Sequence, residues 1–490
     1  MDIPASQEHD AFRNELASVA RDGRRKWIYA RKPSGRLYRL RTVLSWALLA
    51  FLFLAPFITV DGQPLMMLNV LDRRFVLLGM FFRPQDFYLV VLIGLTCLVT
   101  VVLSTVVFGR IWCGWLCPQT IFMEMLFRKL EYFIEGSAEQ QLRRDRGPWT
   151  RDKMWRRGIK HAIFFALSFV IANVFLAWII GAPALRAIVT DPPARHIVGL
   201  VAIVIFSFVF YLVFARFREQ ACVLACPYGR MLSALTDART ITITYDWRRG
   251  EPRNRLVRGA SEAAGDCIDC HQCVTVCPTG IDIRDGIQLE CVNCTACIDA
   301  CNGVMARVGR PLGLIRLTSH DAIATAGAIT PSAARGVPSF TSRLAHTLKT
   351  GLSARVVAYT GVWLILAVSV AVLLAGRRDL DVLILRQPGT LYTTITGGDV
   401  ANFYTVQALN RTSRTRAFTI EVVTPAGATI SSLGELGDVS PYGLAESRVM
   451  LRLRPGDLKG ANTPIQFAVR ADDGVVQTID SSFVGPAERQ

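Results

Sequence analysis

Eight cysteines between positions 267 and 301 have the types and spacing of iron–sulfur ligands. The run Cys-x₂-Cys-x₂-Cys-x₃-Cys occurs twice in this stretch. Three closely spaced thiolates wrap one face of a cubane, and in two-cluster bacterial ferredoxins the fourth thiolate of each run ligates the other cluster. We therefore predict two [4Fe–4S] clusters: cluster 1 on Cys267, Cys270, Cys273 and Cys301, and cluster 2 on Cys277, Cys291, Cys294 and Cys297.

A four-cysteine zinc site is the alternative for this stretch. Zinc ribbons use isolated Cys-x₂-Cys pairs and not two runs of four cysteines, so the spacing favours clusters. One residue departs from the ferredoxin pattern: Pro278 follows Cys277, whereas Asn302 follows Cys301, where proline is usual. We expect this asparagine to make the surroundings of its cluster more polar.

Two further cysteine pairs repeat along the chain. Cys113-x₃-Cys117-Pro118 recurs 109 positions later as Cys222-x₃-Cys226-Pro227. Proline is favoured at the first position of a helix, which predicts the preceding cysteine at the N-cap, where the helix dipole favours thiolate. Thiolates select soft ions such as Cu(I). Inert packing and disulfides are the alternatives, and the spacing leaves open whether the four thiols form one site or two.

The elements that must hold these cysteines include membrane spans. The chain is 51% hydrophobic with a mean hydropathy of +0.33, which is high for a soluble protein of 490 residues. Apolar runs near the ~20 residues that a bilayer requires predict five transmembrane helices. Their ranges are 43–60, 87–108, 161–180, 197–217 and 356–375.

Basic residues predict the orientation of these spans. Lys and Arg crowd the N-terminal arm and the 109–160 loop and also lie at the start of the 218–355 loop, whereas 61–86 and 181–196 are nearly neutral. The positive-inside rule then predicts a multi-pass protein of the bacterial inner membrane, with the N-terminus and the cysteine-rich segment cytoplasmic and the C-terminus periplasmic. The net charge of +16 is thereby explained without a nucleic-acid partner.

The C-terminal region has a different character. Short alternating runs separated by turn signals recur after the fifth span, and no cysteine occurs there. This pattern is typical of an all-β sandwich. The predicted fold is thus a multi-domain membrane protein: an α-helical transmembrane bundle of five spans, an inserted bacterial-type 2[4Fe–4S] ferredoxin domain and a C-terminal all-β Ig-like sandwich.

The predicted domain boundaries follow from these shifts in composition. They are a basic cytoplasmic arm (1–42), a four-helix membrane domain with the two repeated hairpin and Cys-x₃-Cys-Pro units (43–235), a cytoplasmic ferredoxin-like domain (236–319), a linker (320–355), the fifth transmembrane helix (356–376) and a periplasmic Ig-like sandwich (377–490).

These motifs together resemble the CcoG/FixG/RdxA family of cytochrome c oxidase accessory proteins. The resemblance rests on Trp112-Cys-Gly-Trp-Leu-Cys-Pro-Gln-Thr120, on Cys222-Val-Leu-Ala-Cys-Pro-Tyr-Gly229, on the ferredoxin run and on the Ig-like C-terminal region. The cysteine motifs alone are shared with membrane quinol dehydrogenases of the NapH type. The fifth span and the β domain favour the first family.

The resemblance implies a cupric reductase linked to the assembly of cbb₃-type cytochrome c oxidase. It implies catalytic, copper-binding roles for Cys113, Cys117, Cys222 and Cys226, and cluster-binding roles for the eight ferredoxin cysteines. The expected partners are the lipid bilayer, copper ions as substrate or transient ligand, a cytoplasmic electron donor, a copper-exporting P-type ATPase and oxidase assembly factors.

Two other functions remain open from the sequence. The first alternative to a cupric reductase is a NapH-like quinol dehydrogenase relay. The second is a scaffold for oxidase assembly whose β domain binds a subunit. No Gly-rich dinucleotide fingerprint follows a predicted strand, so we do not expect the chain itself to bind NAD(P)H.

Overall fold

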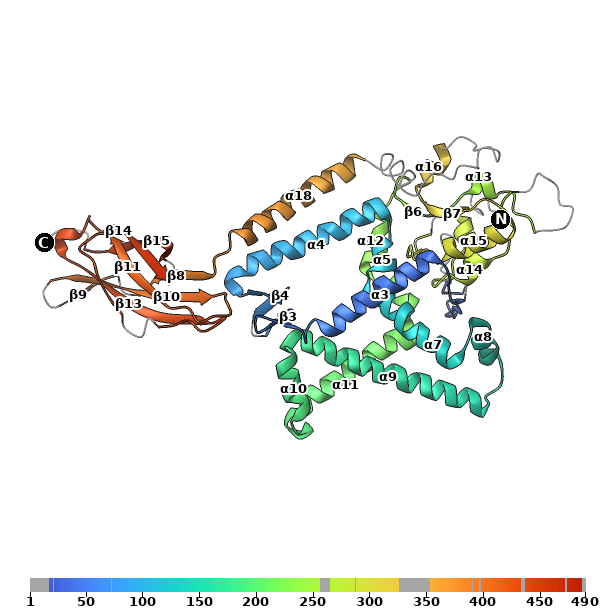
Figure 1. Ribbon diagram of the computed structural model, residues 1–490, viewed down its shortest axis with the longest axis horizontal. Helices are drawn as coiled ribbons and strands as arrows, with labels where there is room; N and C mark the ends of the chain where they lie inside the picture. The colour runs from blue at the N-terminus through green and yellow to red at the C-terminus, as the bar shows by residue number, and fades with distance from the viewer. Residues whose placement is uncertain are drawn as a thin grey trace. The chain divides into compact units, whose positions relative to one another are not determined.

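The computed structural model divides the chain into two compact units, each described by itself (Figure 1). The first unit comprises Met1–Ile58, Met66–Arg73 and Gln85–Val370, and the second comprises Thr59–Leu65, Arg74–Pro84 and Ala371–Gln490. The residues described are 17–20, 22–71, 73–255, 265–286, 288–325, 353–389, 391–395, 398–432, 437–471 and 474–486. Most of the predicted linker, 326–352, lies outside them.

Five helices in the described residues are long and apolar enough to cross a membrane, which confirms the predicted number. Most of their apolar side chains face outward, as expected of helices surrounded by lipid. The first begins at Arg36, seven residues before the predicted start, and ends at Leu54. The five are α3 (Arg36–Leu54), α4 (Phe87–Phe108) after a 3₁₀ turn (Pro84–Asp86), α9 (Arg151–Ile180), α11 (Ile197–Leu212) with its π-helical extension η4 (Val213–Phe217), and α18 (Ala354–Ala375).

Aromatic side chains pack the interior of the helical bundle. The rings of Phe127 and Phe214 stack at 4.7 Å between centroids, and Phe164 meets Phe127 edge-on. These rings join α9 and η4 to the π-helical turn η2 (Phe122–Phe127), which follows the first cysteine pair. Trp363 on α18 donates to the Thr100 hydroxyl on α4 at 2.8 Å, so these two helices lie side by side (Figure 1).

Shorter helices connect the spans. The segment after α4 forms α5 (Ile111–Trp115), α6 (Pro118–Ile121), η2, α7 (Arg128–Glu135) and α8 (Ala138–Arg146). The connection between α9 and α11 contains α10 (Ala182–Thr190), followed by η3 (Pro193–His196). After η4 come the π-helical turn η5 (Ala221–Ala225) and α12 (Pro227–Leu235).

The ferredoxin-like segment is a small α+β domain. Its strands β6 (Thr242–Tyr245) and β7 (Ile315–Thr318) pair antiparallel. The cysteines pack in one core with Ile243 and Ile315 of these two strands and with Ile283 and Met305. The strand pair therefore covers the predicted cluster region. The remaining elements are α13 (Trp247–Gly250), α14 (Gln272–Thr275), η6 (Ile283–Asp285), α15 (Ala296–Arg307) and α16 (His320–Thr325).

The C-terminal region of the second unit is a two-sheet β structure. One sheet has the order β12-β13-β10-β8 with β9 beside β10, the other has the order β11-β14-β15, and all pairs are antiparallel. Tyr404 and Phe467 meet edge-on in the core between the sheets. The strands are β8 (Leu380–Arg386), β9 (Thr393–Thr394), β10 (Val400–Asn410), β11 (Phe418–Thr424), β12 (Thr429–Ser432), β13 (Leu444–Leu453), β14 (Asn462–Ala471) and β15 (Gly474–Val484).

A short hairpin from the connection between the first two spans belongs to the same unit. It is formed by β4 (Arg74–Leu77) and β5 (Met80–Phe82). Phe81 meets the Tyr442 ring edge-on at 5.6 Å, and the Arg83 guanidinium donates to the Tyr442 carbonyl at 3.1 Å. The Ig-like fold is therefore packed against a segment that lies far earlier in the sequence. Three further short strands lie in this connection: β1 (Thr59–Val60), β2 (Gln63–Pro64) and β3 (Met66–Asn69).

Candidate redox site

The eight ferredoxin cysteines line two separate cavities. One is lined by Cys267, Cys270, Cys273 and Cys301, and the other by Cys277, Cys291, Cys294 and Cys297, with Cys273 at its edge. The structure thus gathers the residues into the two groups that the spacing predicts, with the last cysteine of each run placed in the other group.

The backbone around both cavities follows one repeated pattern. Asp269 and His271 have φ of 50° and 53°, and Asn293 and Thr295, at the same places in the second run, have φ of 51° and 65°. Such left-handed turns point successive N–H groups into a concavity that suits anions, and many iron–sulfur sites use them. The loops therefore present the same donor arrangement to each group of four thiols.

The chemistry of the cysteines also fits clusters. Burial raises the pKa of Cys273, Cys291 and Cys301 to about 12, so these thiols sit in apolar surroundings. Within the described residues, no three His, Cys, Asp or Glu side chains converge on one point as the ligands of a single metal ion do. Thiolates of a cubane bind different iron atoms and stand further apart, so the residues fit a [4Fe–4S] cluster better than zinc.

Asn302 has a structural explanation that the sequence did not reveal. Pro278 follows the end of α14, where a proline removes no helical hydrogen bond, whereas Asn302 lies within α15, where a proline would remove one. The Asn302 side-chain oxygen also accepts a hydrogen bond from the Gly313 N–H at 2.9 Å. The departure from the ferredoxin pattern therefore preserves a helix and ties it to the loop before β7.

The two Cys-x₃-Cys-Pro units adopt related backbones. Each span ends at a residue with positive φ, Gly109 at 56° and Arg218 at 52°, and these residues are also 109 positions apart. Cys117 is the N-cap of α6, and Pro118 and Pro227 are the first residues of α6 and α12. The helix starts predicted from the prolines are therefore present in both units.

The four thiols of the two Cys-x₃-Cys-Pro segments lie close enough to influence one another electrostatically. Burial raises the pKa of Cys113 to about 12; the nearby Arg110 charge opposes this shift, and the neighbouring thiols Cys117 and Cys226 add to it. Burial likewise raises the pKa of Cys222 to about 12, with further contributions from the other three thiols. All four therefore interact electrostatically.

Side-chain contacts join the two Cys-x₃-Cys-Pro segments, which both belong to the first compact unit, around these thiols. The Arg110 guanidinium donates to the Gly229 carbonyl, and the hydroxyls of Thr105 and Tyr228 share a hydrogen bond. Both contacts join a residue that precedes the first cysteine pair to a residue directly after the second. The two segments therefore pack together, although no three of their four described thiols converge on one point.

This thiol region rests directly on the loop that surrounds cluster 2. Cys113 packs against a small apolar core formed by Val276, Val292, Cys294 and Ala296. The Trp115 indole N–H donates to the Asn293 carbonyl at 3.1 Å, and the Asn293 side-chain amide donates to the Phe108 carbonyl at 3.0 Å. The contacts hold the end of α4, the first cysteine pair and cluster 2's loop as one assembly.

Two arginines beside the thiols were not predicted as site residues. Arg41 is 1% exposed and donates to the Gly114 carbonyl at 2.7 Å, and its charge acts on Cys294. Arg110 is 5% exposed, and its charge acts on Cys113 and on Cys291. Because basic residues near spans are ordinarily topology signals, only the position of Arg110 three residues before Cys113 could have indicated its role.

Comparison with known proteins agrees with this architecture. Residues 217–320 match the family of the 4Fe-4S dicluster domain, residues 90–134 match a 4Fe-4S binding domain, and residues 370–486 match the Ig-like fold at the C-terminus of FixG. The chain is therefore an iron–sulfur protein of the membrane with an Ig-like C-terminal domain.

The curated relatives align over most of their length. The nitrogen fixation protein FixG of Rhizobium meliloti (strain 1021) is 33% identical over 84% of this chain and 82% of its own length. RdxA of Cereibacter sphaeroides is 35% identical over 94% of this chain and 97% of its own, and RdxB of the same organism is 31% identical over 92% of both. The cluster cavities, the paired cysteine units and these alignments together establish that the chain belongs to the FixG/RdxA (CcoG) family.

Proposed function

We propose that this protein reduces Cu(II) to Cu(I) at the Cys-x₃-Cys-Pro thiols, with electrons that pass through its two [4Fe–4S] clusters. The observation that supports this most directly is the packing of Cys113 against the small apolar core that includes Val292 and Cys294. A soft thiol site in van der Waals contact with a cluster's own ligand loop is suited to one-electron transfer between them. The clusters supply that one-electron chemistry when bound.

The residues around the thiols have distinct tasks in this proposal. Cys113, Cys117, Cys222 and Cys226 supply the thiolates for copper, two to an ion because no three of these described cysteines converge on one point, and thiolates favour Cu(I) over Cu(II) and so draw the reduction forward. Arg110 offsets part of the negative charge that thiolates bring to a buried place. Trp115 holds the first cysteine pair on the Asn293 carbonyl, which keeps the transfer distance constant.

The orientation of the protein is part of the proposal. The N-terminal arm contacts the ferredoxin-like segment: the Arg31 N–H donates to the Thr275 carbonyl at 2.7 Å, and the Ala17 N–H donates to the Glu290 carboxylate. These contacts support placing both on one side of the membrane, and the basic loops favour the cytoplasm. The Cu(I) formed there would pass to an exporting P-type ATPase and serve the assembly of cbb₃-type cytochrome c oxidase.

The test is anaerobic and uses the full chain in detergent. The clusters are reduced with dithionite, excess reductant is removed, and Cu(II) is added with a chromophoric Cu(I) chelator. We expect Cu(I) to appear as the cluster absorbance recovers, and this to be lost in a Cys113→Ser/Cys117→Ser variant. Cys97→Ser, a change of the lone cysteine within α4, is the matched control and keeps the activity.

Two results would count against this function. Full copper reduction in the Cys113→Ser/Cys117→Ser variant would show that these thiols are not the site. Iron analysis covers the other case, because residues 90–134 match a 4Fe-4S binding domain. If this variant loses iron as well as activity, the thiols hold a cluster and not copper.

A further inference from the structure

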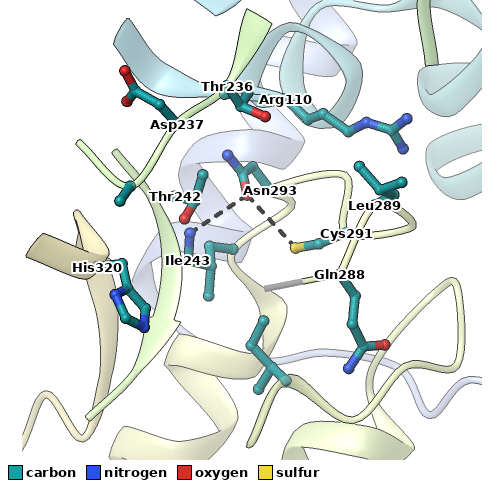
Figure 2. A pocket seen from close by; sticks show the side chains of 13 residues that line it. Arg110, Thr236, Asp237, Thr242, Ile243, Gln288, Leu289, Cys291, Asn293 and His320 are labelled. Atoms are coloured by element: carbon teal, nitrogen blue, oxygen red, sulfur yellow. Dashed lines mark hydrogen bonds between the residues drawn. The ribbon is translucent and has the colours of Figure 1, made fainter. Parts of the chain in front are cut away.

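A pocket of ≈ 310 Å³ opens at the loop that carries the predicted cluster 2 ligands (Figure 2). It reaches Cys291, a cluster 2 ligand, and Arg110, the arginine beside the copper thiols. Asn293 forms part of its floor, where the side-chain oxygen accepts from the Ile243 N–H. The volume lies at the lower end of the range for small-molecule sites.

The pocket lies where the membrane meets the ferredoxin-like segment. Gly109 and Arg110, which line it, follow the last residue of α4 directly. The residues directly before β6 are hydrogen-bonded to that helix end. The Ile241 N–H donates to the Val107 carbonyl at 2.9 Å, and the Thr240 hydroxyl donates to the Val106 carbonyl at 3.0 Å. The pocket therefore opens directly beside the end of a span, which suits a ligand that comes from the membrane.

The lining combines apolar walls with a polar rim. Ile243, Ile283 and Leu289 contribute the apolar surface, and Leu289 is 55% exposed at its edge. Asp237, Gln288 and His320 contribute oxygen and nitrogen atoms around this surface (Figure 2). This lining suits a flat apolar ring that carries oxygen substituents.

We propose that the pocket binds a quinol from the membrane, which serves as the electron donor in place of a soluble cytoplasmic protein. The identity of the final electron acceptor, copper, rests on the proposed function. The existence of the quinol site does not depend on it. Oxidation of one quinol to quinone releases two electrons and two protons. The protein can accept both electrons, one on each cluster, and both protons leave through the solvent-exposed rim at Asp237 and His320.

The buried arginines favour electron transfer in this direction. Reduction adds one negative charge to a cluster, and nearby positive charge raises its reduction potential. Arg41 and Arg110 both lie close enough to act on cluster 2 ligands. Cluster 2 should therefore be easier to reduce than a ferredoxin cluster without such neighbours, which brings it closer to the range of a quinol. Cluster 1 then holds the second electron until another Cu(II) arrives.

The decisive variant fills the pocket. Ala238 lines it with an exposed, small side chain, so Ala238→Trp blocks the volume without disturbing the core. Ala306, an exposed alanine on α15 outside the pocket lining, provides the matched control Ala306→Trp. Leu289→Ala is a gentler second variant that removes only the apolar edge.

Two measurements are made on the full chain with both clusters present. Menadione binding to the oxidised protein is followed by calorimetry, and cluster reduction by menadiol is followed anaerobically by absorbance. We expect at least tenfold weaker binding and tenfold slower reduction in Ala238→Trp, a smaller loss in Leu289→Ala and no change in Ala306→Trp. Dithionite must reduce the clusters of all four proteins equally, which shows that the variants are folded.

The inference is overturned if menadione does not bind, or if Ala238→Trp binds and reacts as fast as the parent protein. These failures are separate from failure of the proposed function. A dithionite-reduced protein that still converts Cu(II) to Cu(I) would retain the copper reductase and lose only the quinol site. Quinol-driven cluster reduction without any copper reduction would retain the site and sink the copper proposal.

Discussion

The backbone of Gly114 lies directly against the carbonyl of Val292. A Cβ atom at position 114 would stand well inside the 3.0 Å that real Cβ contacts almost never cross, and its neighbours would be backbone atoms that cannot rotate away. The glycine between the two cysteines of the first pair is therefore required for the pair to dock on cluster 2's loop. Only glycine, which has no Cβ atom, allows two backbone segments to approach this closely.

Gly114→Ala should move Cys113 and Cys117 away from the loop that carries the cluster 2 ligands. We expect transfer from reduced clusters to Cu(II) to slow severalfold, because the added methyl group pushes the cysteine pair away from the loop and electron transfer weakens with distance. Rapid-mixing absorbance measures it. Gly303→Ala, on α15 in open space, is the control and should leave the rate unchanged. Parent-like kinetics in Gly114→Ala would mean that electrons do not use this contact.

Arg41→Gln should lower the reduction potential of cluster 2. Arg41 has a terminal nitrogen with no hydrogen-bond partner among the described residues, so its charge is only partly offset. Removing that charge disfavours the more negative reduced cluster, and we expect a fall on the order of 60 mV, a tenfold change in a one-electron equilibrium. A redox titration followed by electron paramagnetic resonance reports it. Arg41→Lys keeps the charge and should stay near the parent value; equal potentials in all three proteins would exclude this role.

Copper affinity should increase with pH. Because burial raises the pKa of Cys113 and Cys222 to about 12, both thiols are protonated at neutral pH, and a bound Cu(I) must displace their protons. Below about pH 12, each displaced proton contributes up to about tenfold in affinity per pH unit. Chelator competition between about pH 6.5 and about pH 8.5 measures the slope. The slope should diminish in Cys222→Ser, and a flat profile in the parent protein would argue against buried thiol ligands.

Asn302→Pro should destabilise the ferredoxin-like segment even though it restores the usual ferredoxin residue. The substitution places proline within α15, which costs about 3 kcal/mol, and it also removes the bond to Gly313. Asn302→Ala removes only that bond and should cost about 1 kcal/mol. Anaerobic thermal unfolding and the rate of cluster loss compare the two. If Asn302→Pro is as stable as the parent, helical continuity at this position is not the reason for the asparagine.

Much of this protein could be predicted from local sequence. The five spans follow from hydropathy, because a bilayer demands about 20 apolar residues wherever a helix crosses it. The assignment of Cys301 and Cys277 to opposite clusters follows from spacing, since three close thiolates occupy one face of a cubane and exclude the fourth of the same run. The offset of 109 residues indicated two repeated units, and Gly109 and Arg218 indeed end their spans in the same backbone conformation.

Only the tertiary structure decided how these parts meet. Arg41 reads as a topology charge in the sequence, yet α3 begins at Arg36 and buries it against Gly114. The docking of Cys113 on cluster 2's loop and the pocket at Cys291 both join segments more than 170 positions apart. Hydropathy and ligand spacing act within a few turns of chain, whereas these contacts depend on packing between separate elements. The spacing in the sequence therefore determined which cysteines group together, and the tertiary packing decided which segments lie against those groups.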